Sequence, residues 1–579
     1  MVKQKKQRVS EVSTGQKRIR LWPGVVIVIL QWLLWFGIPL IIESDIGLLT
    51  GMLGVLVGVL GIIVWWTFFS RAPGIERWGA ILLMIVAMIA TNFFLDESLA
   101  ASQMGMTFVI YSLPFLCLAF VIWAVVTQHL SNSVRRISMV ATIVVVCGVW
   151  TLLRSDGMTS DIGHDFSWRW AGTPEEQFLT QTGDEPMAVP MTPADTGMTA
   201  EWPGFRGPER NGIIHGVQIA TDWTAFPPVE LWRRPVGPGF SSFAVNGNLL
   251  FTQEQRGEEE VVSCYNLLTG QPVWKHSDAA RFLGDDANPG PRATPTLTDS
   301  LVCTLGATGI LNVFDSRDGS VIWSHNAVAD INARIPGWGL ASSPLVVDDV
   351  VVVHVDSTLV AYDRTTGDLR WTGPAGTGYS SAQLVTIDSL TQILMFGGNG
   401  LTSFAPADGT ILWEYKWSLG DCILQPGLAP DNEILLSAVL KELRLIKVTH
   451  NLEDWTIEES WTSNRMRSNF NDLVVHKGHA YGFENQNLAC LDLKDGSRKW
   501  KGKRYGGQIL LLADQDLMIV LTEKGDVVLV NATPDQFTEL ARCSAINGKT
   551  WNHPVLVDDI LVVRNREEMA AFRLSPAGS

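Results

Sequence analysis

A nine-residue pattern returns five times in the C-terminal part of the chain, and every copy has a Gly four residues before a Trp. An Asp or Asn at the start of a copy can hydrogen-bond forward to the turn backbone, and Gly accepts the positive φ of a short hairpin loop. The Trp then lies on the outgoing strand, where we expect it to fill the space between neighbouring sheets. The copies are NLLTGQPVW (266–274), DSRDGSVIW (315–323), DRTTGDLRW (363–371), APADGTILW (405–413) and DLKDGSRKW (492–500).

Weaker versions of this hairpin place further positions at Trp232, Trp461 and Leu540, which makes eight positions at steps of 39 to 49 residues. A period of 40 to 50 residues that holds about four short strands is typical of a β-propeller. The chain ends with three strands that lack a fourth, and the strand around Trp232 precedes its own unit. We therefore expect an all-β, eight-bladed propeller in which that strand completes the last sheet. An array of β-sandwiches is the alternative, but it does not predict this pairing of the two ends.

Five apolar runs precede the β-rich part, and each is long enough to cross a bilayer as a helix of about 20 residues. They predict a five-helix transmembrane domain over 21–153, in contact with the lipid bilayer, behind a basic tail at 1–20. The runs are 21–42, 46–69, 78–95, 105–126 and 137–153.

Charge indicates the orientation of these helices. Up to Leu153 the chain holds 11 Lys and Arg against six Asp and Glu, a net charge of +5. The whole chain has a net charge of −15, so the part from Arg154 onward has a net charge of −20. Basic residues gather before the first run, after the second (Arg71, Arg77) and after the fourth (Arg135, Arg136). The positive-inside rule then predicts a cytoplasmic N-terminus in a bacterial inner membrane and a periplasmic propeller. The acidic propeller also argues against nucleic acid as a partner.

The segment 154–201 reads as a polar linker, and its aromatic stretch FSWRW (166–170) suggests that it docks on the propeller of 202–579. The seven Cys form no CxxC, no CxxCH and no adjacent pair, so we expect no zinc, covalent haem or dithiol site. Two acids in GDDANPG (284–290) are explained equally well by a solvated turn.

The innermost strand of each blade should line an axial channel, and polar residues recur where these strands begin. Such a ring of donors, with two cations, would suit an anionic or quinone-like ligand. The alternative is that these side chains bind water and one another and cap the inner strands. The predicted ring contains Arg292, Ser342, Tyr379, Gln425, Arg467, Asn469, Asn471, Gln508, Asn552 and His553.

Acidic residues are scarce in this ring. Asp472 is the single acid at these positions, whereas calcium needs about six to eight oxygen ligands, mostly carboxylate, so we expect no metal. His553 titrates near neutral pH in water and is a candidate general base. Its sequence context ties no Asp or Glu to it, and packing beside Trp551 is the alternative that we favour.

Glycines at 47, 51, 54, 58 and 61 share one face of the second membrane run, where a neighbouring helix can approach closely. Packing within the bundle or in a dimer explains them. A quinone pocket between the helices would need buried polar groups, and Gln31 and Asn92 are the only suggestive ones.

The repeat resembles that of the pyrroloquinoline-quinone-type (PQQ-like) propellers, which include quinoprotein alcohol dehydrogenases and a lipoprotein that assists outer-membrane protein assembly. WPGFRGPERNG (202–212) looks like the segment that opens the propeller in one bacterial group of these proteins. Five spans before a propeller also resemble membrane-bound quinoprotein glucose dehydrogenase. That resemblance implies PQQ with calcium as cofactor and membrane quinone as electron acceptor.

The chain also departs from the dehydrogenase pattern. Its eight blades span 229–574 with about 43 residues each, which leaves little room for the insertions that surround the cofactor in those enzymes, and their adjacent Cys pair is missing. We therefore predict a noncatalytic platform that binds a protein partner or a small ligand at the funnel, with no cofactor. The alternatives are a sugar or alcohol dehydrogenase and an envelope assembly factor.

Overall fold

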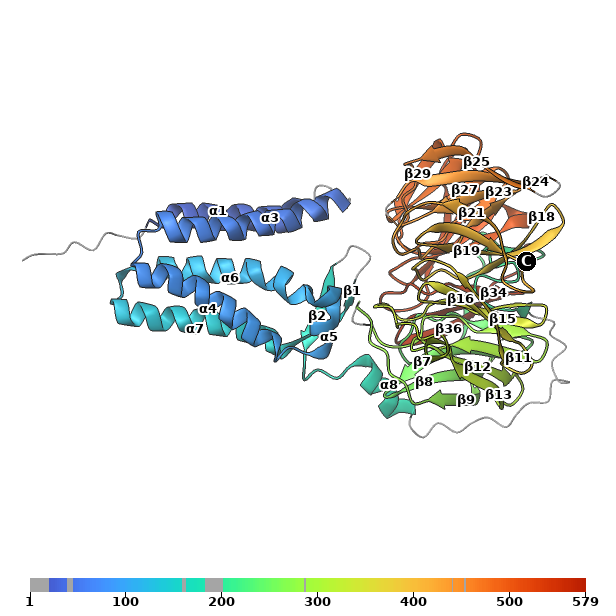
Figure 1. Ribbon diagram of the computed structural model, residues 1–579, viewed down its shortest axis with the longest axis horizontal. Coiled ribbons are helices and arrows are strands. Elements are labelled where there is room, and N and C mark those ends of the chain that lie inside the picture. Colours follow the sequence, from blue (N-terminus) through green and yellow to red (C-terminus); the bar gives the residue numbers. More distant parts are fainter. Residues whose placement is uncertain are drawn as a thin grey trace, which may run out of the picture. The chain divides into compact units, whose positions relative to one another are not determined.

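The computed structural model describes residues 20–38, 45–158, 163–182, 201–285, 288–439, 441–451 and 454–578. These residues form two compact units (Figure 1). One unit is helical and ends in a short β-hairpin, and the other is an eight-bladed β-propeller, as the repeat predicts. The basic tail before Arg20, Asp286 and the linker residues 183–200 lie outside the described residues.

The helical unit contains the predicted apolar runs. Within the described residues, four helices are long and apolar enough to cross a membrane, and the segment Trp22–Gly37 is apolar but shorter. Short turns connect them: α5 (Glu97–Ala101), η3 (Ser102–Gly105), η4 (Thr127–His129) and η5 (Trp150–Leu152). The apolar helices are α1 (Trp22–Trp32) with η1 (Leu33–Gly37), α3 (Asp45–Val64) with η2 (Trp65–Phe69), α4 (Gly74–Asn92), α6 (Thr107–Val126) and α7 (Asn132–Val149).

The glycine face of α3 packs against α1. A β-carbon on Gly54 would stand 2.7 Å from the Leu34 side chain, and one on Gly58 would stand 2.7 Å from Gln31. Gln31 also donates to the Val55 carbonyl at 3.1 Å. The glycines therefore serve packing within the bundle, and Gln31 is part of that contact, while Asn92 is exposed. The packing of Gly47 lies outside the described residues.

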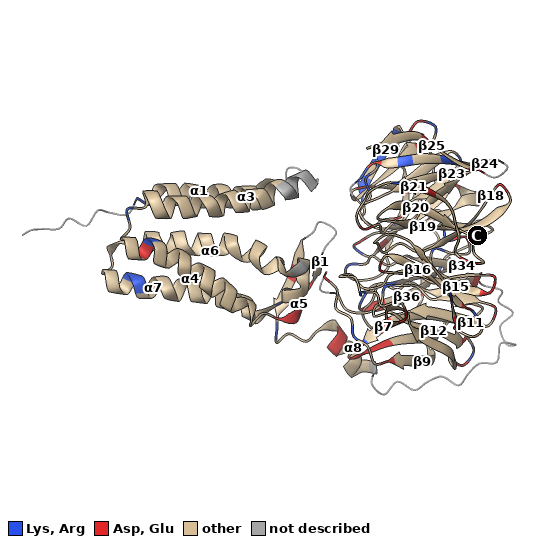
Figure 2. Ribbon diagram, in the orientation of Figure 1, with Lys and Arg blue, Asp and Glu red and all other residues tan. Residues whose placement is uncertain are grey.

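Basic segments meet at one end of this unit. The Arg20 N–H donates to the Ser70 carbonyl at 3.0 Å, so the start of α1 lies beside the end of η2. Glu76, at the start of α4, is buried and pairs with Arg135 at 2.5 Å and Arg136 at 3.2 Å. The helix bodies between the ends are almost free of charge (Figure 2).

The linker region contacts both units through different segments. In the hairpin of β1 (Leu153–Met158) and β2 (His164–Trp168), Phe166 packs edge-on against Tyr111 and Trp150 of the helical unit. Helix α8 (Pro174–Thr182) packs on the propeller instead. There Glu175 pairs with Arg281 at 2.9 Å, and the Phe178 ring lies 5.0 Å from the Arg256 guanidinium.

The first four blades are antiparallel sheets of four consecutive strands each. Blade 1 has β6 (Ala244–Asn246), β7 (Leu249–Arg256), β8 (Glu259–Asn266) and β9 (Pro272–Asp278); blade 2 has β10 (Thr296–Thr298), β11 (Leu301–Leu305), β12 (Ile310–Asp315) and β13 (Val321–Asn326); blade 3 has β14 (Leu345–Val347), β15 (Val350–Val355), β16 (Thr358–Asp363) and β17 (Leu369–Pro374); blade 4 has β18 (Gln383–Ile387), β19 (Leu390–Gly397), β20 (Gly400–Phe404) and β21 (Ile411–Lys416). A one-turn helix, α9 (Ala327–Asp330), follows β13.

The other four blades complete the ring. Blade 5 has β22 (Gly427–Ala429), β23 (Glu433–Ser437), β24 (Leu443–Asn451) and β25 (Asp454–Ser463); blade 6 has β26 (Val474–His476), β27 (His479–Glu484), β28 (Asn487–Asp492) and β29 (Arg498–Arg504); blade 7 has β30 (Gln508–Leu512), β31 (Leu517–Leu521), β32 (Asp526–Asn531) and β33 (Glu539–Ser544); blade 8 has β34 (Val555–Val557), β35 (Ile560–Arg564), β36 (Glu568–Arg573) and β5 (Val229–Pro235).

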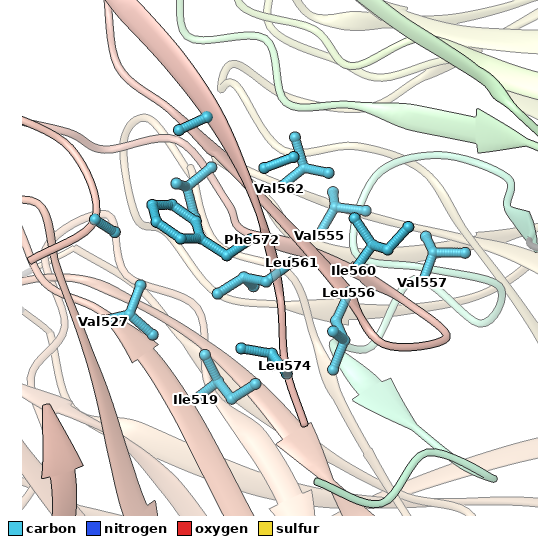
Figure 3. Packing of buried hydrophobic residues seen from close by; sticks show 14 of the residues in the cluster. Ile519, Val527, Val555, Leu556, Val557, Ile560, Leu561, Val562, Phe572 and Leu574 are labelled. Carbon is cyan, nitrogen blue, oxygen red and sulfur yellow. The ribbon is translucent and has the colours of Figure 1, made fainter. Parts of the chain in front are cut away.

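The predicted closure is confirmed, because β5 pairs antiparallel with β36 and places Trp232 opposite Ala571. The seam between blades 7 and 8 is apolar: Leu561 and Phe572 of blade 8 lie in one cluster with Ile519 of blade 7 (Figure 3). Arg564 is buried and donates to the Gly237 and Gln253 carbonyls, which ties blade 8 to the start of blade 1.

The repeated hairpin also forms the seams between blades. In six blades the indole N–H of this position donates to a carbonyl in the third-to-fourth-strand turn of the next blade. In five of those turns a Gly lies under the ring at a φ of 67° to 78°, and the turn that Trp500 reaches has no Gly. The bonds are Trp232 to Leu267 (2.8 Å), Trp274 to Ser316 (3.0 Å), Trp323 to Arg364 (2.9 Å), Trp371 to Pro406 (3.0 Å), Trp461 to Leu493 (2.6 Å) and Trp500 to Thr533 (2.7 Å). Trp413 differs, because its indole N–H donates to Gln392 Oε1 of its own blade at 2.6 Å.

The prediction for blade 7 is wrong by one residue. Leu540 sits at the bulge of β33 and is exposed, while Ala541 pairs with Leu529 at the position that Trp holds elsewhere. A large ring would find no glycine turn there, because the third and fourth strands of blade 8, β36 and β5, are not joined by a turn. Instead Ile219 packs there beside Leu574, with the Ala220 N–H bonded to the Ser575 carbonyl at 2.8 Å.

Candidate functional site: the occupied axial channel

The axial channel is occupied by the chain's own segment 201–214, which we call the plug. It begins as β3 (Glu201–Trp202), which adds to the innermost strand β6, and it ends as β4 (Ile213–Ile214), which adds in parallel to β30. Both additions lie toward the same ends of the inner strands, so the plug enters and leaves through one mouth of the channel. The motif 202–212 was recognised in the sequence, but its position inside the propeller channel was not predicted.

Two arginines fix the tip of the plug. Arg210 is buried and donates to the Ser343 and Pro344 carbonyls at 2.8 and 2.7 Å, at the start of β14. Arg206 donates to the Leu473 carbonyl at 2.6 Å, at the start of β26. Both have positive φ, 59° at Arg206 and 54° at Arg210, a conformation that costs free energy for non-glycine residues. The hydrogen bonds of the guanidinium groups hold the turn in place.

Arg206 forms the centre of a buried charged cluster. Its guanidinium lies 3.6 Å from the Asp472 carboxylate, and His553 Nε2 lies 3.6 Å from the same carboxylate, too far for a hydrogen bond. Burial and then the nearby Arg206 lower the pKa of His553 to about 3, so its ring is neutral. Burial raises the pKa of Asp472 and lowers that of Arg206. A neutral His553 lies edge-on to Phe205 of the plug at 5.0 Å.

The starts of the inner strands are linked from blade to blade by hydrogen bonds. In each of five bonds a backbone N–H or hydroxyl of one blade meets a side-chain or carbonyl oxygen of a neighbouring blade, and we call the set the polar belt. The bonds are Ser242 N to Thr294 Oγ1 (3.1 Å), Thr294 N to Ser343 Oγ (3.0 Å), Ser343 N to Ser381 Oγ (2.9 Å), Gln425 N to Asp472 Oδ1 (2.7 Å) and Ser242 Oγ to the His553 carbonyl (2.6 Å).

Five of the predicted ring residues are buried beside this belt: Ser342, Gln425, Asn471, Gln508 and Asn552. Asn471 and Asn552 extend it, because their amides donate to the Gly507 carbonyl at 2.7 Å and the Ser241 carbonyl at 2.9 Å. The structure thus brings these side chains together around one end of the channel. Their hydrogen bonds to neighbouring blades match the alternative in which the ring caps its own strands.

The other predicted residues lie nearer to solvent. Arg292 and Tyr379 are half-buried at the rim, and Arg292 donates to the carbonyls of Gly290 and Trp338. Burial raises the pKa of Tyr379 to about 12. Asn469 is half-buried as well, whereas Arg467 is exposed and donates to Asn464 at 2.8 Å, away from the ring.

An aromatic cluster that we did not predict from the sequence lies at the belt end of the channel. The Trp551 ring stacks on Phe240 at 5.4 Å and contacts Phe470 at 4.6 Å, while Lys549 Nζ lies 4.4 Å from its centroid. Its indole N–H donates to Glu523 at 2.8 Å. Phe240, Phe470 and Trp551 each lie a few residues before an inner strand. This shared position was the sequence feature from which the cluster could have been predicted.

Among the cavities in the described part of the chain, two lie beside the plug. One of about 420 Å³ lies between Pro208 to Arg210 and the inner strands of blades 3, 4 and 5. The other, of about 310 Å³, lies between the plug and Leu556 to Asp558 of blade 8. Within the described ranges, no three His, Cys, Asp or Glu residues come together in a group able to hold a metal ion.

Several solved structures and one family model are similar to the propeller. A europium-containing methanol dehydrogenase matches 65% of this chain and 99% of its own, with a TM-score of 0.50 and 11% identity. Quinohemoprotein alcohol dehydrogenase from Comamonas testosteroni matches 70% and 85%, with a TM-score of 0.50 and 13% identity. The family described as outer membrane protein assembly factor BamB matches residues 223–335 and 258–502. The repeat is of the PQQ-like type.

At identities of 11% and 13%, the likeness of this PQQ-like propeller to those structures shows a shared fold. BamB from Moraxella catarrhalis also aligns with it, over 60% of this chain and 98% of that one, with a TM-score of 0.45 and 15% identity. No curated protein matches the chain. The proteins similar to the PQQ-like propeller include dehydrogenases among the solved structures and, by the family model, an assembly factor.

Proposed function

We propose that this protein is a membrane-anchored, noncatalytic interaction platform whose PQQ-like propeller offers its outer surface, not its axial channel, to a protein partner. One observation carries the proposal: Arg206 of the plug is buried in the channel, where its guanidinium lies 3.6 Å from the Asp472 carboxylate. A segment of the same chain thereby occupies part of the channel in which we predicted a ligand to bind.

The residues at the channel do not fit PQQ with calcium. Asp472 is the acid of the predicted ring, and its Oδ1 already accepts the Gln425 N–H at 2.7 Å while Arg206 lies 3.6 Å away. Calcium needs about six to eight oxygen ligands, mostly carboxylate. A guanidinium beside the carboxylate would repel the cation. We therefore derive no redox step for this chain.

A direct measurement tests the platform against the dehydrogenase alternative. The full-length protein, purified in detergent, is titrated with PQQ in the presence of calcium and then assayed for dye reduction with glucose, ethanol and methanol. We expect neither saturable PQQ binding nor substrate-dependent reduction. Stoichiometric binding with turnover would overturn the proposal and make the protein a quinoprotein dehydrogenase. The funnel ring stays a prediction as a site for other ligands.

We further propose that the helices anchor the protein in a bacterial inner membrane with the propeller in the periplasm. The support is that Arg20, Arg77, Arg135 and Arg136 lie in segments that meet at one end of the bundle, as Arg20 N to Ser70 O and the Glu76 ion pairs indicate. Basic ends face the cytoplasm. Alkaline phosphatase, which is active only after export, should be active when fused after Ser579 and inactive when fused after His129. The reverse pattern would contradict this orientation.

A further inference from the structure

Every blade ends in an outer strand whose far edge has no strand partner in the described sheets. These eight strands are described in full: β9, β13, β17, β21, β25, β29, β33 and β5. Seven of them carry at least one Asp, Glu, Lys or Arg, and β29 alone has Arg498, Lys499, Lys501, Lys503 and Arg504 (Figure 2). Charged side chains of this kind keep an exposed edge from pairing with other chains. The exception is β13, whose sequence is VIWSHN.

The side chains of β13 also favour pairing. Val321 is 44% exposed and Ile322 is 46% exposed. Ile322 sits at the bulge where the register with β12 shifts. A six-residue window that is rich in β-branched and aromatic residues, with no charge and no Pro, has the composition of a strand-pairing hazard when it is left open.

The strand is held ready in one conformation. Trp323 is buried in the seam and donates to the Arg364 carbonyl at 2.9 Å, which fixes the middle of β13. The Asn326 side chain accepts the Ala329 N–H at 3.0 Å and caps α9, which fixes the end. A preorganised edge loses little conformational entropy when a second strand adds to it.

This chain already forms structure by adding distant segments to open edges. Strand β5 adds to β36, β3 adds to β6 and β4 adds to β30, and each addition satisfies backbone groups that the recipient strand leaves free. The free edge of β13 presents the same alternation of N–H and C=O groups. An extended polypeptide is the occupant with matching chemistry.

We propose that β13 is the docking strand of the propeller and that an extended segment of a partner protein adds to it. The partner segment is uncharged and apolar at alternate positions, to cover Val321 and Ile322, and it has basic residues at its ends. Asp318 precedes β13 and Asp330 follows it, in a propeller unit that is acidic overall. This assignment rests on the proposed platform function and names its surface.

The probe is a labelled synthetic peptide of alternating Val and Thr with two Lys at each end, added to the full-length protein in detergent. We expect saturable binding by fluorescence anisotropy, together with slower amide hydrogen exchange in residues 320–326 but not in 539–544. The same peptide methylated on alternate backbone nitrogens should bind at least about tenfold more weakly, since it cannot donate along one edge.

A matched pair of variants locates the site. Ile322→Lys places a charge at the bulge of β13, and Leu540→Lys places one at the equivalent bulge of β33, where Leu540 is 39% exposed and Glu539 and Arg542 already supply charge. Ile322→Lys should weaken peptide binding at least about tenfold, and Leu540→Lys should leave it unchanged. Thermal unfolding of both variants checks that the propeller stays folded.

Three results would overturn the assignment: no saturable binding, equal binding of the methylated peptide, or equal loss in both variants. Light scattering tests whether a second copy of this chain binds at β13. A dimer that Ile322→Lys dissociates would mean that the occupant of β13 is this chain itself and not a different protein. The PQQ titration is independent of these results. If the peptide does not bind at β13 and PQQ does not bind either, the proposed platform function remains, with the partner bound to another surface of the propeller.

Discussion

The indole ring of Trp371 lies where a side chain on Gly409 would have to go: a β-carbon there would stand 2.5 Å from the nearest ring atom. The same indole donates to the Pro406 carbonyl at 3.0 Å. The glycine of each repeat is therefore required twice, once by the φ of its own turn and once by the tryptophan of the preceding blade. The spacing of the nonapeptide is the same in all five copies because the glycine turn of each blade packs under the tryptophan ring of the preceding blade.

Replacing Gly409 by Ala should separate these two requirements. At a φ of 72° the methyl group costs about 1 kcal/mol in backbone strain, and the clash with Trp371 adds about 1 to 3 kcal/mol. Gly478→Ala is the control, because Gly478 has a φ of 76° and nothing within 4 Å of the added carbon. Urea unfolding should show a larger loss for Gly409→Ala. Equal losses would mean that the seam yields to the methyl group.

Removal of the Arg206 guanidinium should destabilise the propeller through Asp472. An Arg206→Met variant leaves a buried carboxylate without its cation, which costs about 3 to 5 kcal/mol. The double variant with Asp472→Asn should recover most of that loss, because the amide oxygen still accepts the Gln425 N–H. Denaturant unfolding of the two single variants and the double variant measures this coupling. Additive losses would contradict the charged contact.

His553 should make the propeller sensitive to acid. Its folded pKa of about 3 lies below the ordinary value of 6.5, so between these pH values the unfolded chain binds a proton that the folded chain does not. Stability is therefore lost as the pH falls, by about 2 kcal/mol between pH 7 and pH 4.5. His553→Gln should flatten this slope, and buried His354, whose pKa is also lowered, should preserve part of it. Thermal unfolding across this range tests the change, and an unaltered slope would refute it.

Glu260 should act in the opposite direction. It is buried, accepts the Ala307 N–H at 3.0 Å and faces Asp278 across the strand pair, and burial raises its pKa to about 7. The folded chain thus holds a proton that the unfolded chain releases above about pH 4.5, and this contribution to stability is lost as the pH rises through 7. Glu260→Gln keeps the neutral form. At pH 8 the variant should be about 2 kcal/mol more stable than the wild type, and at pH 4 nearly equal. A less stable variant at pH 8 would contradict the assignment.

The sequence predicted the features that repeat. Eight regular Gly and Trp positions were enough for the blade number, and the unmatched strand around Trp232 was enough for the closure. Blade 7 was misread because a bulge decides which residue enters the seam, and VNATPDQFTELA gives no tryptophan to mark Ala541. A register shift of one residue leaves no trace in composition.

The site was predicted less well than the fold. The positions before the inner strands do gather at one end of the channel, but their partners are backbone groups of neighbouring blades, and no sequence pattern encodes those contacts. The plug was hidden for a similar reason: Arg206 binds the Leu473 carbonyl across 267 residues of chain. Long-range contacts to a backbone carbonyl depend on the folded ring and not on the identity of the residue that offers it.

The pairing of β5 with β36 has a consequence for biosynthesis. Val229 lies opposite Arg573, so the first of the four-strand blades' own strands to leave the ribosome must wait for the last one. Until β36 is made, β5 has no partner strand, so blade 8 and the ring stay incomplete. The edge of β5 is therefore open to other chains until synthesis of the propeller is almost finished.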